Sequence, residues 1–223
     1  MIIRYKYEEL MAAAKPTLIF AASMQRSAST WLFNVARVLL SSQEALAEKF
    51  SSGWIGDLDK MPMKPVMLVK VHDFHPKIID QASFIFYSFR DVRDVLASMY
   101  RQFGQEPTLD AASSAIENHE CWLRYAGFVM KYEDMAANKL VIVQSLAEKL
   151  GIKEYEATKV VEEVDGLKKT NSDSAKYDTT NLYHKGHITD GRHGSWEGIL
   201  NKDLEKKIVD KHYDWFKRYG YVD

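Results

Sequence analysis

The stretch TLIFAASMQRSASTW, residues 17–31, is the most informative part of the sequence because it predicts a strand, a loop and a helix in that order. Residues 17–23 form a short apolar run after a proline, which is typical of a buried strand. Residues 24–29 are polar and predict a loop, and from Thr30 to residue 40 apolar residues recur with helical spacing. A strand that passes through a polar loop into a helix is a building unit of sheets covered by helices.

The same alternation continues along the chain. Further apolar runs predict strands over residues 66–71, 83–89 and 128–132. Helical spacing predicts further helices over residues 92–103, 109–125, 140–150 and 204–219, and the polar, glycine-rich segment 168–198 predicts a long loop. Strands that alternate with helices predict an α/β fold, a three-layer sandwich with a central parallel sheet, similar in type to the P-loop nucleotide transferases.

Composition limits the classes of function. The chain has 223 residues, 46% of them hydrophobic, which suits one domain spanning residues 1–223. Thirty Lys and Arg against 31 Asp and Glu give a net charge of −1, so no overall charge excess points to nucleic acid or an anionic membrane, and an anion site must be local. The single cysteine, Cys121, excludes an intramolecular disulfide, and no signal-peptide pattern or membrane-spanning run is present. We therefore expect a cytoplasmic protein.

The loop after the first predicted strand has the character of an anion site. In parallel sheets ligands bind at the carboxyl ends of the strands, and the start of the following helix offers free backbone N–H groups to an anion. Arg26 adds a fixed positive charge, and Ser27, Ser29 and Thr30 add hydroxyl donors. The same residues also suit a simple capped helix. The loop lacks the Gly-x-x-x-x-Gly-Lys-Ser/Thr pattern of nucleoside triphosphatases.

Together with Trp31, this loop resembles the first signature of the cytosolic-type sulfotransferases, Lys-Ser-Gly-Thr-Thr-Trp. The resemblance implies that Arg26 contacts the sulfate end of the donor 3′-phosphoadenosine 5′-phosphosulfate (PAPS) and that Trp31 stacks on its adenine. It assigns the 5′-phosphate to Ser27, Ala28, Ser29 and Thr30. Two residues depart from the family pattern: Arg26 replaces lysine, and Ala28 replaces glycine, which requires position 28 to avoid a positive φ.

Two further segments resemble the family's signatures. Residues 90–98, RDVRDVLAS, resemble Arg-x-Pro-x-Asp-x-x-x-Ser, which implies that Arg90 and Ser98 hold the 3′-phosphate; read alone, the segment is a surface helix with salt bridges. Lys70-Val-His72 resembles Lys-x-His, which implies that His72 is the general base. Lys70 and His72 lie on the same side of the predicted strand, and nearby His75 competes for the role.

The fourth resemblance lies in the predicted long loop and leaves two alignments open. The family closes its site with Arg-Lys-Gly followed by Gly-x-Trp. One alignment places Lys185 and Gly186 at the 3′-phosphate, followed by Gly194-Ser-Trp196. The other follows a variant common in bacterial members and places Gly191 and Arg192 there. Residues 132–134, YED, also resemble a structural feature of the family.

The resemblance implies an in-line transfer of the sulfuryl group from PAPS to a hydroxyl or amine acceptor. His72 would remove the acceptor proton, Lys70 and Arg26 would offset developing charge, and no metal is required. We expect a small-molecule, glycan or lipid acceptor. Residues 42–65 and the helix from Leu109 are expected to contact it, with Phe50, Trp54, Met61 and Met63 as candidates for an apolar pocket.

Two other functions fit parts of the sequence. A phosphotransferase of the nucleotide-kinase type shares the fold, but it needs a loop lysine before Ser or Thr and a carboxylate that holds Mg²⁺. A nucleotide-binding module without catalysis would keep Trp31, Arg90 and Ser98 and use His72 only structurally. Activity that depends on ATP and Mg²⁺ favours the first, and absence of sulfate transfer favours the second.

Overall fold

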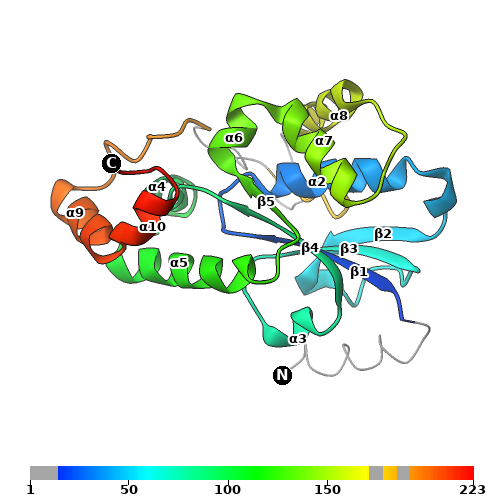
Figure 1. The fold of residues 1–223 in the computed structure, drawn as a ribbon, viewed down its shortest axis with the longest axis horizontal. Helices are drawn as coiled ribbons and strands as arrows, with labels where there is room; N and C mark the ends of the chain where they lie inside the picture. The colour runs from blue at the N-terminus through cyan, green and yellow to red at the C-terminus, as the bar shows by residue number, and fades with distance from the viewer. Residues whose placement is uncertain (1–14, 171–177, 185–190) are drawn as a thin grey trace.

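The computed structural model describes residues 15–170, 178–184 and 191–223, and side chains of residues 168–170 are not described. A five-stranded sheet lies at its centre in the order β2-β3-β1-β4-β5, with every neighbouring pair parallel (Figure 1). The strands are β1 (Thr17–Ser23), β2 (Phe50–Trp54), β3 (Val66–Val71), β4 (Ala82–Phe89) and β5 (Phe128–Lys131). The expected central parallel sheet is confirmed.

Helices cover both faces of the sheet. They are α2 (Ser29–Ser41), α3 (Pro76–Ile79), α4 (Val92–Phe103), α5 (Leu109–Leu123), α6 (Tyr132–Ala137), α7 (Lys139–Lys149), α8 (Ala157–Thr170), α9 (Lys202–Lys211) and α10 (Tyr213–Arg218), with short 3₁₀ turns at Glu44–Leu46 and Ile55–Asp57. α2, α7 and α8 lie on one face, and α4, α5, α9 and α10 supply the core of the other. Within the described ranges, no helix is both long and apolar enough to span a membrane.

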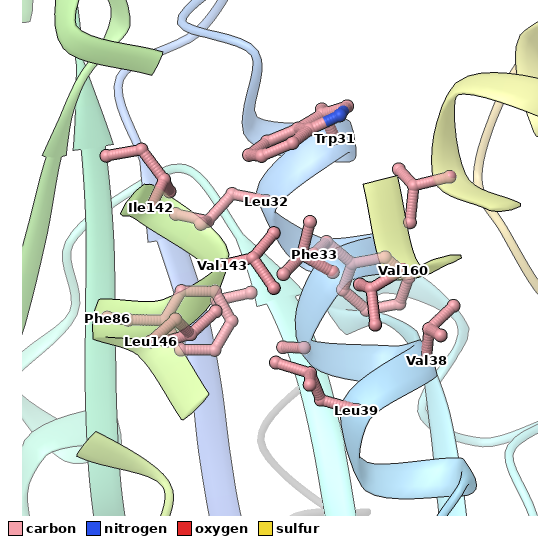
Figure 2. Close-up of a cluster of buried hydrophobic side chains, with 14 of the residues drawn as sticks. Trp31, Leu32, Phe33, Val38, Leu39, Phe86, Ile142, Val143, Leu146 and Val160 are labelled. Atoms are coloured by element: carbon pink, nitrogen blue, oxygen red, sulfur yellow. The ribbon is translucent and has the colours of Figure 1, made fainter. Parts of the chain in front are cut away.

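Two hydrophobic cores follow from the alternation of side chains along β1. Ile19 and Ala21 pack with α2, α7 and α8, whereas Leu18, Phe20 and Ala22 pack with the helices of the opposite face. Successive side chains of a strand point to opposite faces, so a strand covered on both sides is apolar throughout. Figure 2 shows the first core, in which side chains of α2 meet those of β4, α7 and α8. The expected three-layer α/β fold is confirmed.

Several elements differ from the sequence expectations. The edge strand β2 was not expected, because only Ser51 and Gly53 of FSSGW are fully buried and its pattern carries no apolar run. Helix α8 extends into the segment 168–198 that predicted a loop. The expected final helix is two helices, because His212 leaves the helical region with φ −120° and ψ 28°. The break directs Trp215 and Phe216 into the second core.

Candidate functional site

The site lies where the carboxyl ends of β1, β3 and β4 meet. β1 lies between β3 and β4, so the chain crosses from one side of β1 to the other after β3. Such a point, where the strand order reverses, leaves a crevice beyond the strand ends in which α/β proteins bind their ligands. The loop 24–28, His72 and Arg90 follow these strands directly. The topology therefore brings together three segments that are far apart in the sequence.

A cavity of about 480 Å³ opens at this point. It is lined by Gln25, Arg26, Ala28, Ser29, Trp31, Lys70, His72, Arg90, Ser98, Phe103, Tyr132, Met135, Ala136, Lys139, Tyr183, His184 and Gly191. Four lysine and arginine side chains line it, and no aspartate or glutamate is among the described lining residues. In a chain with a net charge of −1, this concentration of positive charge indicates an anion site.

The cations at this site destabilise one another. Burial lowers the pKa of Arg26, and the charge of Arg90 lowers it further. Burial, and then the charge of Arg26, lower the pKa of Lys70 to about 7. Burial and the charge of Lys70 lower the pKa of His72 to about 3, with a smaller lowering from Arg26, against a hydrogen bond with Ser23. A bound anion would reverse these shifts, because an opposite charge favours the protonated forms.

The loop between β1 and α2 is shaped to present backbone N–H groups. Arg26 has φ 60°, and Ala28 has φ 59° and ψ 28°, so both lie in the left-handed region. Loops with left-handed residues form concave nests of N–H groups that bind anions. The expectation that Ala28 avoids a positive φ is wrong, because the tight entry into α2 places this residue in a conformation that usually requires glycine.

We expect Ala28→Gly to raise the free energy of unfolding by about 1 kcal/mol, because glycine adopts the left-handed conformation without the steric cost of a Cβ atom. The measurement is chemical denaturation of both proteins. Ala111→Gly is the matched control, since Ala111 is exposed within α5 and its replacement should lower the free energy of unfolding by about 1 kcal/mol. An Ala28→Gly protein no more stable than the parent would contradict this account.

The three hydroxyls of the loop have different surroundings. The Ser27 hydroxyl lies within hydrogen-bonding distance of the Met24 carbonyl at 2.6 Å and the Ser88 hydroxyl at 2.8 Å, and the side chain is fully buried. The Thr30 hydroxyl accepts a hydrogen bond from Lys70 Nζ at 2.5 Å. Of the three, only Ser29 lines the cavity. Ser27 and Thr30 therefore use their side chains to hold the loop and Lys70.

Arg90 is fixed on several sides. Its Nη2 atom lies 3.2 Å from Asp94 Oδ2 and also donates to the backbone carbonyl of Arg192, and its guanidinium centre lies 4.1 Å from the centroid of the Tyr132 ring. Among the described residues, its buried Nε atom has no hydrogen-bond partner. Ser98, two turns further along the same helical segment, accepts a hydrogen bond from Arg26 Nε at 2.9 Å. Arg26 and Ser98 are therefore joined by a hydrogen bond, and Arg90 lines the same cavity.

At the end of β3, His72 is held by its backbone and its ring. The carbonyl of His72 accepts hydrogen bonds from Trp122 Nε1 at 2.9 Å and Asn118 Nδ2 at 3.0 Å. Its Nδ1 atom lies 2.7 Å from Ser23 Oγ. His75 is exposed and accepts the N–H of Lys77 at the start of α3, and it does not line the cavity. Of the two histidines, only His72 reaches the cavity.

No protein-family model matches the sequence, and no curated protein matches it. The fold, in contrast, is similar to that of solved structures. Mouse sulfotransferase SULT7A1 complexed with PAP superposes on this chain with a TM-score of 0.70 at 14% identity, over 96% of this chain and 94% of that one. This chain has the sulfotransferase fold. Two structures of retinol dehydratase, one with retinol and PAP and one with androsterone and the inactive cofactor PAP, each give a TM-score of 0.64 at 15% identity, over 96% of this chain and 86% of theirs.

Within this sulfotransferase fold, one of the two alternative closing segments can be placed. Lys185 and Gly186 lie outside the described residues. Gly191 lines the cavity, and its carbonyl accepts a hydrogen bond from the Tyr132 hydroxyl. Arg192 contributes its carbonyl to Arg90, and its side chain is not among those that line the cavity. The contact between Arg90 and the segment beginning at Gly191 is therefore made through the backbone.

The residue that attaches this segment to the rest of the fold is Asp94, a position of the 90–98 motif to which the resemblance gave no role. Asp94 is fully buried and accepts hydrogen bonds from Gly194 N at 2.9 Å and Trp196 N at 3.1 Å, besides its ion pair with Arg90. Its spacing of four residues from Arg90 was the available signal in the sequence.

Lys139 lines the cavity and was not predicted to do so. Its Nζ atom pairs with Asp165 Oδ2 at 2.5 Å, and Trp31 Nε1 donates a hydrogen bond to Asp165 Oδ1 at 3.1 Å. Nothing local in the sequence marks that pair.

Proposed function

We propose that this protein is a sulfotransferase that moves a sulfuryl group from PAPS to a hydroxyl or amine acceptor. The observation that carries the proposal is the cavity at the strand ends of a sulfotransferase fold, which is lined by two arginines and two lysines and by no described carboxylate. The donor carries negative charge at both its phosphosulfate and its 3′-phosphate, so it fits a cavity with separate cationic groups. The three similar structures contain PAP, which supports a nucleotide of this kind.

The donor would lie across the ends of β1 and β4. The N–H groups of loop 24–30 and the start of α2, a helix of 13 residues, would hold the 5′-phosphate. Arg90 and Ser98 would hold the 3′-phosphate, and the buried Nε atom of Arg90, which has no hydrogen-bond partner among the described residues, supports that placement. Trp31, anchored through its N–H to Asp165, would offer its ring to the adenine. Either Lys185 or Arg192 is predicted to complete the contacts to the 3′-phosphate.

The reaction would follow from the groups at the end of β3. The acceptor oxygen attacks sulfur, the bond between sulfur and the bridging phosphate oxygen breaks, and PAP leaves with that electron pair. His72 takes the acceptor proton, while Lys70 and Arg26 stabilise the negative charge on the transferred group and the leaving oxygen. His72 is neutral at pH 7, since its pKa is about 3. The negative charges of bound donor would raise this pKa and make His72 a stronger base.

The acceptor would enter beside His72. Trp54 packs against the imidazole with 5.3 Å between ring centroids, and Phe103 lines the cavity with 53% of its surface exposed. Aromatic surface beside the base supports an acceptor with an apolar part, which agrees with the expected small-molecule or lipid class. Met61 contacts Gly53 of β2 and belongs to the second core, so it supports the wall that carries Trp54.

A direct test is incubation of the protein with PAPS and a panel of phenols, sterols, sugars, lipid alcohols and amines, read by the mass of the sulfated product. We expect product with at least one class and matching release of PAP. PAP binding without any transfer would favour a non-catalytic nucleotide-binding module. Phosphate transfer that requires ATP and Mg²⁺ would favour a kinase-like enzyme. Among the described residues, no cluster of three or more His, Cys, Asp or Glu is placed to hold a metal.

A further inference from the structure

Ser23, the last residue of β1, contacts the imidazole of His72 through two atoms. Its hydroxyl oxygen lies 2.7 Å from Nδ1, and its backbone carbonyl oxygen lies 3.3 Å from the same nitrogen. The hydroxyl also lies 3.5 Å from the carbonyl oxygen of Val71. Ser23 is 1% exposed, so its side of these contacts is shielded from solvent. Neither the motifs of the sequence nor the proposed chemistry assigns Ser23 a role.

These contacts favour one of the two neutral forms of the ring. A carbonyl oxygen can only accept a hydrogen bond, so its position 3.3 Å from Nδ1 is favourable when Nδ1 carries the proton. Without that proton, the lone pairs of Nδ1 and of the carbonyl would face each other. With it, Nδ1–H is shared between the two oxygens of Ser23, and the Ser23 hydroxyl can direct its own proton to Val71.

We propose that Ser23 is a positioning residue that holds the proton of neutral His72 on Nδ1 and so keeps the Nε2 lone pair available to the acceptor. This inference rests on the proposed sulfotransferase function only for its catalytic consequence. The nitrogen that takes a proton is decided by the hydrogen bond that the other nitrogen makes. An imidazole with its proton on Nε2 would present a donor, not a base, to an acceptor hydroxyl.

The surroundings of the ring explain why such a group is needed. The backbone of His72 is held by Trp122 and Asn118 and its ring packs against Trp54, which leaves the position of the ring proton to be fixed. The charges that act on His72 are the cations Lys70 and Arg26. In a Ser-His-Asp triad a carboxylate orients the ring. Here a neutral hydroxyl and carbonyl do so, which orients the base without holding it in its charged form.

The first test is the nitrogen NMR spectrum of uniformly ¹⁵N-labelled histidine side chains in the free protein at pH 7.5. His72→Gln identifies the His72 signals by their loss. We expect a protonated Nδ1 and an unprotonated Nε2, which the two nitrogen shifts distinguish. A protonated Nε2 would overturn the proposal. Because this readout needs no activity, it remains decisive if the protein transfers no sulfate.

The second test compares Ser23→Ala with Ser23→Thr, which keeps a hydroxyl. We expect Ser23→Ala to lower kcat about tenfold, as is usual for groups that orient a reactive side chain, and to show both proton positions in the spectrum. The affinity for PAP should stay unchanged, and Ser23→Thr should recover most of the activity. A Ser23→Ala enzyme with the parent kcat and an unchanged spectrum would overturn the proposal. Loss of PAP affinity together with kcat would also overturn it, because Ser23 would then serve the loop and not the base.

Discussion

His72→Ala is expected to transfer sulfate at least about 100-fold more slowly than the parent protein, with an unchanged affinity for PAP. General-base catalysis contributes about 10²–10⁴ to a rate, and within the described part of the cavity only His72 combines a neutral imidazole with a position beside Lys70. Steady-state rates at saturating donor, together with calorimetric titration of PAP, measure the two quantities separately.

His75→Ala is the matched control for this variant. His75 lies three residues further along the chain, is exposed, and caps the short helix α3 without reaching the cavity. We expect it to retain the parent rate. A His72→Ala protein that is nearly as active as the parent would show that His72 is not the base. Equal losses of activity in His72→Ala and His75→Ala would show that either substitution disturbs the structure at the end of β3.

Arg90→Ala is expected to weaken PAP binding about 30-fold, which corresponds to about 2 kcal/mol for a charge-assisted hydrogen bond. The loss should be selective, because Arg90 is proposed to hold the 3′-phosphate. Adenosine 5′-monophosphate, which lacks that phosphate, should bind the variant and the parent equally. Calorimetric titration of both ligands into both proteins provides the comparison.

Two further variants protect this prediction from effects on folding. Arg90→Ala leaves Asp94 without its ion-pair partner, although backbone N–H groups of the 194–196 turn still hold that carboxylate. Arg90→Lys keeps the charge but not the planar fork, so we expect an intermediate loss of PAP affinity. Arg124→Ala, at an exposed residue after α5, should have no effect. Equal weakening of both ligands by Arg90→Ala would show that the 3′-phosphate is held elsewhere.

The sequence predicted those parts of the fold that depend on local pattern. The runs 17–23 and 66–71 and the helix 92–103 match β1, β3 and α4 because each has an apolar pattern that its neighbours in the chain reveal. Strand β2 and helix α8 were missed, since β2 gains its place by pairing with β3 at the sheet edge. Helix α8 was missed although Val160 and Val164 have the spacing of one helix face and are both buried.

In the candidate site, too, residues within local motifs were predictable and contacts between distant segments were not. Arg26, Lys70, His72, Arg90 and Ser98 were named from short motifs, and the fold brings all of them to one cavity. Partners that act across the fold were not predictable: the pair formed by Ser23 and His72 is separated by 49 residues and that formed by Trp31 and Asp165 by 134. The left-handed conformation of Ala28 was also hidden, because alanine gives no sign of a positive φ.

A crystal structure with adenosine 3′,5′-bisphosphate would show directly whether this cavity binds the nucleotide. We expect the 5′-phosphate against the N–H groups of loop 24–30, the 3′-phosphate within hydrogen-bonding distance of Arg90 and Ser98, and the adenine against Trp31. A ligand bound outside this cavity, or bound with its two phosphates exchanged between the ends of β1 and β4, would contradict it.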